Sequence, residues 1–185
     1  EALKWAELTR AASPALDAMA LLPPGSAKWF SAACEAADAH GKLADGNQLI
    51  AIGLALRGAP QHPDTLAARV TATAQAAFQL FQAGHYELAQ QLLDQIEQVS
   101  GDQVGPGILA RVYQTRSTRA MFAGDVGAYL ECEQAAAEAF ERADDQRYAC
   151  QQRGHVGYAC LEIGAFEDAE QHLRAALEAA TRLGL

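Results

Sequence analysis

The stretch 160-CLEIGAFEDAEQHL-173 places a single glycine, Gly164, between two segments whose apolar residues have helical spacing. Glycine is the expected residue where one helix ends in a left-handed turn and the next begins almost at once. After the turn, the helical period continues at Leu173, Ala176, Leu177 and Ala180. The stretch therefore predicts a helical hairpin with a very short turn.

The same pattern occurs twice earlier in the chain, in 80-LFQAGHYELAQQLL-93 and 120-AMFAGDVGAYLEC-132. The three turn glycines, Gly84, Gly124 and Gly164, follow one another at equal intervals. Small residues stand where the paired helices must approach closely: Ala77, Ser117 and Gly157 before the turns, and Ala89, Ala128 and Ala169 after them. A fixed period of this length is typical of a helical repeat protein.

These positions resemble the tetratricopeptide (TPR) repeat. The last hairpin carries that family's pattern at Gly157, Cys160, Gly164, Phe166, Ala169 and Leu173, and the hairpin two units earlier carries it at Ala77, Leu80, Gly84, Tyr86, Ala89 and Leu93. The middle hairpin departs from it, since Val126 replaces the aromatic residue, Ala128 comes one residue early and Cys132 takes the bulky position. The family's Trp and Pro are missing, and the period is longer than is usual for this family and overlaps that of HEAT and armadillo repeats.

The resemblance implies an all-α fold, a right-handed α-solenoid of about four helix-turn-helix repeats after an N-terminal helical segment. We expect a single domain over residues 1–185, divided into the ranges 1–24, 26–58, 64–102, 105–144 and 146–185. Repeats of this length also resemble the helical regions appended to large bacterial signalling proteins, such as Ser/Thr kinases and regulatory ATPases. The chain opens with Glu1 rather than Met, so we expect it to be a piece of something longer.

The first part of the chain is the least regular. Ser26 is expected to cap a helix up to Gly41, which lies farther before Gly84 than one period, so the register slips there. Pro14 is expected to bend or break the preceding helix. Asp64 follows the rigid connector 58-GAPQHP-63 and is expected to cap the next helix.

Composition excludes several partners. The formal net charge of −9 argues against nucleic acid or an anionic membrane as the main partner. No apolar run approaches the roughly 18 residues expected of a membrane span. The four cysteines form no C-x-x-C pair, and we interpret them as small core residues in a reducing, cytoplasmic compartment.

The polar run Gln114–Arg119 lies inside a predicted helix and cannot all face water if that helix has neighbours. Ser117 fills the small packing position. By the register of the resemblance, polar and aromatic residues of the first helices line a concave face: Gln75, Phe78, Phe81, Arg111, Gln114, Thr118, Gln151, His155 and Tyr158. Such a surface suits an extended peptide or an acidic terminus. The alternatives are a solvated polar face and, for Phe78 and Phe81, simple core packing.

No catalytic constellation is evident. The glycines fall singly at turns rather than in a phosphate-binding loop. No histidine has a second histidine four residues away, as a zinc site on a helix would need. We therefore expect no catalytic residues, no metal site, no cofactor and no enzyme activity. The leading hypothesis is a protein or peptide interaction module that serves as a scaffold or regulatory arm. The alternatives are a small-molecule-sensing regulatory domain and self-association into a homodimer through the terminal repeats.

Overall fold

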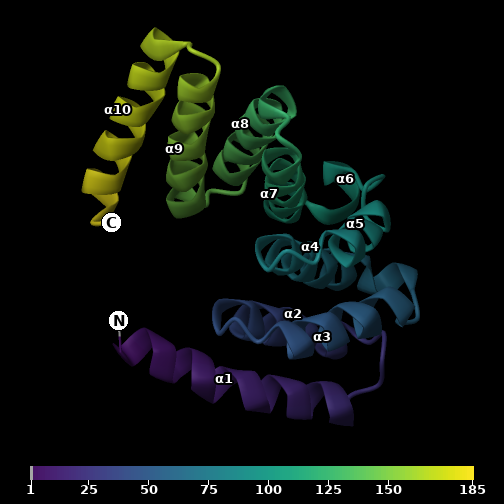
Figure 1. Ribbon diagram of the computed structural model, residues 1–185. Helices are drawn as coiled ribbons and strands as arrows, with labels where there is room; N and C mark the ends of the chain where they lie inside the picture. Colours follow the sequence, from purple (N-terminus) through teal and green to yellow (C-terminus); the bar gives the residue numbers. More distant parts are fainter. Residues whose placement is uncertain (1) are drawn as a thin grey trace. The chain divides into compact units, whose positions relative to one another are not determined.

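A computed structural model describes the backbone of residues 2–185 and the side chains of residues 12–185. All the regular structure in this part of the chain is helical, and consecutive helices pack against each other in antiparallel pairs (Figure 1). The prediction of an all-α fold is confirmed. No helix among the described residues is both long enough and apolar enough to cross a membrane.

The contacts divide the chain between Val99 and Ser100 into two compact units. The first unit contains α1 (Ala2–Leu21), α2 (Ala27–Lys42), α3 (Gly46–Gly58), the 3₁₀ turn η1 (Pro63–Thr65), α4 (Leu66–Gln82) and α5 (Tyr86–Asp94). The second unit contains α6 (Gly101–Val104), α7 (Pro106–Ala123), α8 (Val126–Arg142), α9 (Gln146–Glu162) and α10 (Phe166–Leu183). The repeating sequence pattern does not mark this division.

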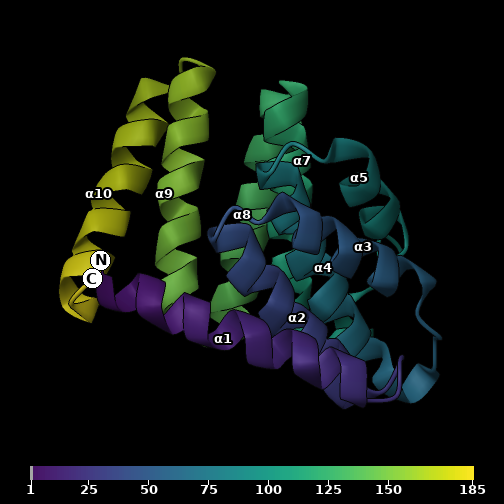
Figure 2. The same ribbon diagram turned by 60° about the horizontal axis from the view of Figure 1, so that its bottom comes forward.

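The first unit has a mainly apolar core. Its helix α2 packs against α1, α3 and α4, while α5 packs against α3 and α4 (Figures 1 and 2). The largest fully buried side chains of this unit are Phe30, Leu49, Ile52, Val70, Leu80, Leu92, Leu93 and Ile96. Alanines such as Ala37 and Ala77 are also fully buried, which allows α2 and α4 to pack closely.

The second unit has a more polar core. Its helices pack in chain order, α7 on α8, α8 on α9 and α9 on α10 (Figure 1). Val112, Phe140 and Val156 are its large buried apolar side chains, but several polar side chains are buried with them: Thr115, Ser117, Thr118, Glu133 and Gln152. The first unit buries fewer polar side chains, His40, Thr73 and Gln79, so the two cores differ in degree. Buried polar groups need partners, and this requirement is heavier in the second unit.

Five short turns share one geometry: the turn at Asp144, which joins α8 to α9, and the four turns that lie within hairpins and are separated by the repeat period. The turn residues of the hairpins have positive φ angles: Ala44 (+56°), Gly84 (+82°), Gly124 (+71°) and Gly164 (+79°). In each hairpin turn the next backbone N–H donates to the carbonyl five residues earlier: Asp45 to His40, His85 to Leu80, Asp125 to Ala120 and Ala165 to Cys160, over 2.8–3.0 Å. The same sequence period therefore separates the four hairpin turns, from the first hairpin to the last.

This geometry corrects the expected register of the first hairpin. Gly41 lies inside α2 and does not form the turn. The left-handed position is held by Ala44, a residue type that rarely adopts such a conformation, so a search for glycines misses it.

The other local predictions have mixed outcomes. Helix α1 continues through Pro14, so the helix is not broken there. Helix α5 ends at Asp94, before the end of the range 64–102 expected for its repeat. Asp64 lies in η1, and the N-cap residue of α4 is Thr65, so the prediction that Asp64 caps this helix is wrong. Ser26 does cap α2, since its hydroxyl accepts a hydrogen bond from the Trp29 N–H at 3.2 Å.

Candidate functional site

The predicted binding residues of the first unit are largely engaged in packing. Phe81 is only 3% exposed and contacts the ring of Tyr86, with 6.5 Å between ring centroids. Gln75 donates through Nε2 to Asp38 Oδ1 at 2.9 Å, and Phe78 is half-buried. The alternative of core packing therefore describes Phe81 better than ligand contact does.

In the second unit, the predicted residues divide into exposed and enclosed ones. Gln151 and Tyr158 are exposed, and a hydrogen bond with Glu162 raises the pKa of Tyr158. Thr118 is only 5% exposed, and its hydroxyl donates to the Gln114 carbonyl at 3.0 Å. Thr118 is therefore not a surface contact for a ligand.

Arg111 is held by an aromatic stack. Its guanidinium carbon lies 4.9 Å from the ring centroid of Tyr148, and that ring stacks on Phe140 with 5.2 Å between centroids. Arg111 also lines a cavity of about 490 Å³ at the start of α7. It is thus fixed in place by α9 and still reachable by solvent.

The polar run is not a solvated face. Gln114, Arg116 and Arg119 are half-buried, and the remaining members of the run are buried. The Thr115 hydroxyl donates to the Arg111 carbonyl at 2.9 Å, while the Ser117 hydroxyl donates to Glu133 Oε1. The run lies between helices, and Ser117 occupies the small packing position as predicted.

Ser117 and Glu133 form the centre of a buried polar cluster. Glu133 is 2% exposed, and His155 Nδ1 lies 3.4 Å from the same oxygen, Oε1, that accepts from Ser117. The other oxygen, Oε2, has no hydrogen-bond partner among the described residues. Burial raises the pKa of Tyr129, one turn earlier on α8, and the Glu133 carboxylate raises it further.

Gln152 is a further buried polar residue, on α9. It is completely buried, and neither its amide oxygen nor its amide nitrogen has a partner among the described residues. His155 follows three residues later, so both side chains lie on the face of α9 that packs against α8. Buried polar atoms without partners are uncommon and need an explanation.

The cluster occupies positions that are apolar in the last hairpin. Counting forward one period from Ser117 and Glu133 leads to Gly157 and Leu173. That pair is in contact, since a Cβ atom added to Gly157 would lie 2.7 Å from Leu173 Cγ. The bulky position of the middle hairpin is therefore held by Glu133, and the assignment of that position to Cys132 is wrong.

The cluster does not have the geometry of a catalytic triad. In such a triad the serine bonds to the histidine, and the carboxylate holds the opposite ring nitrogen. Here Ser117 and His155 both contact the carboxylate of Glu133. Within the part of the chain that the structure describes, no group of three or more His, Cys, Asp or Glu residues could hold a metal ion.

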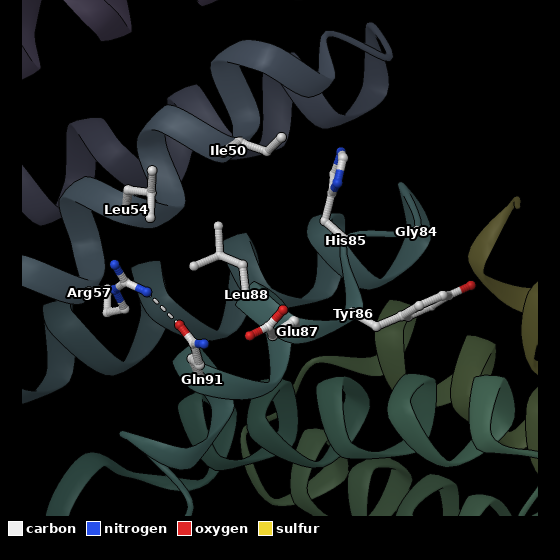
Figure 3. A pocket seen from close by; sticks show the side chains of 9 residues that line it. All are labelled: Ile50, Leu54, Arg57, Gly84, His85, Tyr86, Glu87, Leu88 and Gln91. Carbon is white, nitrogen blue, oxygen red and sulfur yellow. Dashed lines mark hydrogen bonds between the residues drawn. The ribbon is translucent and has the colours of Figure 1, made fainter.

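A separate open groove lies on the first unit, between α3 and α5. It has a volume of about 640 Å³, and its lining residues are Ile50, Leu54, Arg57, Gly84, His85, Tyr86, Glu87, Leu88 and Gln91. Figure 3 shows Ile50 and Leu54 on α3 and Leu88 extending from α5 toward them, and together these side chains form the apolar floor of the groove. Tyr86 points away from this floor.

Polar side chains close the two ends of the groove. At one end, Arg57 Nη1 donates to Gln91 Oε1 at 2.5 Å (Figure 3). At the other end, the His85 ring reaches α3, where a Cβ atom on Gly46 would lie 3.2 Å from its Nε2. Arg57 and Glu87 form no ion pair with any described residue. The groove therefore offers an apolar surface and two charges of opposite sign that no described residue neutralises through an ion pair.

Comparisons with known protein families, with curated proteins and with solved structures found no match for this chain.

This groove was not predicted from the sequence, because the predicted binding residues all lie on the first helix of a hairpin. The groove is lined by the second helices, α3 and α5. One signal was present: Leu54 and Ile50 are four residues apart and therefore share one face of the second helix of their hairpin. Leu54 is 44% exposed and Ile50 is half-buried, so this apolar face is only partly covered.

Proposed function

We propose that the chain is a TPR-like interaction module whose hairpins are repeats of a right-handed α-solenoid. Support comes from the four turns of common geometry at equal intervals along the chain. Further support comes from the buried small residues at equivalent positions before them: Ala37, Ala77, Ser117 and Gly157. Repeats of this kind present side chains along a surface and bind extended or helical segments of other proteins.

The single observation that carries a binding role is the groove between α3 and α5. Its apolar floor of Ile50, Leu54 and Leu88 remains open to solvent although the rest of the first unit has an apolar core. The occupant that fits is an amphipathic helical peptide, because such a helix presents apolar side chains at intervals of three and four residues. The module would thereby serve as a scaffold or regulatory arm of a larger protein.

The charges at the groove indicate the sequence of the peptide. Arg57 is bonded to a neutral amide, so its positive charge attracts a carboxylate of the partner. Glu87 attracts a basic side chain in the same way. We expect bound peptides to carry two or three apolar residues on one helical face, with an acidic residue toward Arg57.

A selection of random peptides displayed on phage against the whole protein tests this proposal. Peptides with the amphipathic pattern should be enriched, and the variant Leu54→Glu should lose them because a carboxylate would stand on the apolar floor. Ala55→Glu is the matched control: the residue is exposed on the same helix, about 100° around it from Leu54, and does not line the groove.

Two results would count against the proposal. If the enriched peptides bind Leu54→Glu as well as the unaltered protein, the groove is not their site. Enrichment of no peptide at all would contradict a peptide-binding role. Circular dichroism of both variants would confirm that the added charges leave the helices intact.

Self-association is a second candidate function, favoured by α10. Phe166, Leu173 and Leu177 are exposed on this helix, and Leu177 is 69% exposed. A second copy of the chain could cover this face. Light scattering should then give the mass of a dimer that Leu177→Glu converts to a monomer. A monomeric mass for the unaltered protein at high concentration would remove this candidate.

A further inference from the structure

A second cavity lies in the other unit, between α9 and the end of α10. It has a volume of about 290 Å³, and its lining residues are Gln146, Ala149, Cys150, Arg153, Ala179, Arg182 and Leu183. We call it the arginine cavity, because its only charged lining residues are Arg153 and Arg182. The protein as a whole carries a net charge of −9, whereas the charged residues that line this cavity are both basic.

The two arginines differ in how they are held. Arg153 Nη2 lies 2.5 Å from Glu141 Oε1, so this guanidinium is fixed by α8 and partly neutralised. Arg182 forms no ion pair among the described residues. The cavity therefore combines one positioned guanidinium with one that no described residue neutralises, and guanidinium groups bind carboxylates through two parallel hydrogen bonds.

The equivalent region of the preceding hairpin is bulkier. There, the equivalent of Arg153 is Tyr113, and the equivalent of Ala180, the neighbour of the lining residue Ala179, is Phe140. Those two aromatic side chains fill that hairpin's core cluster together with Ala110, Ala139, Ala149 and Tyr148. In the last hairpin the aromatic volume is absent and an arginine is present in its place.

The rest of the lining of the arginine cavity is mostly small or apolar. Ala149, Cys150 and Ala179 are buried, and Leu183 is 43% exposed. The Cys150 thiol already donates to the Ala176 carbonyl at 3.2 Å. The lining thus combines buried small side chains with two more exposed guanidinium groups, and ligand pockets commonly join apolar walls to a few polar groups.

We propose that the arginine cavity binds a small carboxylic acid with a short aliphatic chain. The carboxylate would bond to Arg182 and Arg153, and the chain would lie on Ala149, Ala179 and Leu183. The volume lies near the lower end of known ligand pockets, of roughly 300 to 1,000 Å³, which restricts the ligand to a small molecule. This site belongs to a different unit from the α3–α5 groove and does not depend on it.

Titration of the whole protein with sodium hexanoate, followed by amide NMR spectra, tests the proposal. The expected result is a saturable shift of the backbone amides near Ala149 and Ala179. Hexanamide has the same chain without the charge and should bind about tenfold more weakly or not at all, because a charge-assisted hydrogen bond is lost.

Variants separate the proposed site from nonspecific binding. Arg182→Gln should weaken hexanoate binding about tenfold. Arg174→Gln, the control, changes an arginine of the same helix that pairs with Glu170 outside the cavity, and it should leave the affinity unchanged. Ala179→Leu should block binding by filling the cavity while keeping every charge.

Several results would overturn the proposal. These are the absence of a saturable shift near the cavity, equal binding of hexanoate and hexanamide, or an equal effect of Arg174→Gln and Arg182→Gln. Failure of the peptide selection at the α3–α5 groove would leave these measurements unaffected.

Discussion

At the scale of single residues, the buried pair of Ser117 and Glu133 is the point where the second unit departs most from an apolar core. One oxygen of Glu133 is shared by Ser117 and His155, and the other has no partner among the described residues. A buried carboxylate with incomplete partners is less favourable than a well-packed apolar pair of similar volume. Sequences tend to break packing rules of this kind at functional or strained sites.

The double variant Ser117→Ala with Glu133→Leu should therefore be more stable than the unaltered protein, by about 1–3 kcal/mol. It reproduces the pair Ala77 and Leu93, which holds the equivalent positions and is fully buried in the first unit. Ser117→Ala alone should destabilise the fold by about 1–2 kcal/mol, because it removes a partner from a buried charge. Urea unfolding followed by circular dichroism measures both changes. A double variant less stable than the unaltered protein would show that the polar cluster stabilises the fold.

The Tyr129 phenol predicts a stability change at high pH. Burial, aided by the Glu133 carboxylate, raises its pKa above the ordinary value of 10.0. The neutral phenol is favoured in the folded state, so its contribution is complete below pH 10 and is lost as the pH rises through the folded-state pKa. Tyr129→Phe has no such group, so its free energy of unfolding should fall less steeply above pH 10. Urea unfolding at pH 9 and pH 11 measures the two slopes, and equal slopes would contradict the expected shift.

At the scale of elements, the hairpin turns carry the repeat. The glycine positions could be predicted from sequence because three of the four turns use the residue that adopts a positive φ without strain. The first turn could not, because Ala44 has no sequence signal for that conformation. The middle hairpin was misassigned by one residue for a related reason. Ala128 looked like the small packing residue, whereas the equivalent of Ala89 is Tyr129, which is buried.

Glycine and alanine exchanges should therefore have opposite signs at different positions. Ala44→Gly should stabilise the fold by about 0.5–1 kcal/mol because it relieves the strain at φ +56°. Gly164→Ala should destabilise the fold by about 1 kcal/mol, because a residue with a side chain is strained at φ +79°. No neighbouring atom would clash with the added methyl group, so this backbone strain is the whole effect. Gly154→Ala, inside α9 with free space around it, is the control and should stabilise by about 0.5–1 kcal/mol. Thermal unfolding of the three variants gives the signs, and a loss of stability in Ala44→Gly would contradict the assigned turn.

The candidate site was less predictable than the fold. Helical periodicity identifies which residues share a face, but it does not say which face remains uncovered. Phe81 and Thr118 lie on the predicted stripe and are buried, whereas Ile50, Leu54 and Leu88 are ordinary core types that line an open groove. Exposure depends on contacts between helices that are distant in sequence, such as α3 with α5.

At the scale of the whole molecule, the chain comprises two compact units, each with its own buried side chains. Contacts between neighbouring helices dominate in both, as expected where stability is distributed along consecutive elements. The segment 95–105 connects α5 to α7, and its one helix is the four-residue α6.

A fragment of residues 100–185 should therefore fold by itself. Its four long helices pack only in consecutive pairs, so the fragment retains every contact between helices within its unit. We expect a helical circular dichroism spectrum and a cooperative urea transition. A fragment with helical signal but no cooperative transition would show that the second unit depends on the first.

The central claim is that the groove between α3 and α5 receives a peptide. Amide hydrogen exchange of the whole protein, with and without a peptide from the selection, tests it most directly. We predict slower exchange in Gly46–Gly58 and Tyr86–Asp94 when the peptide is bound, with little change in α7 and α9. Protection confined to α7 and α9 would place the peptide on the first helices of the second unit, and would contradict binding in the α3–α5 groove.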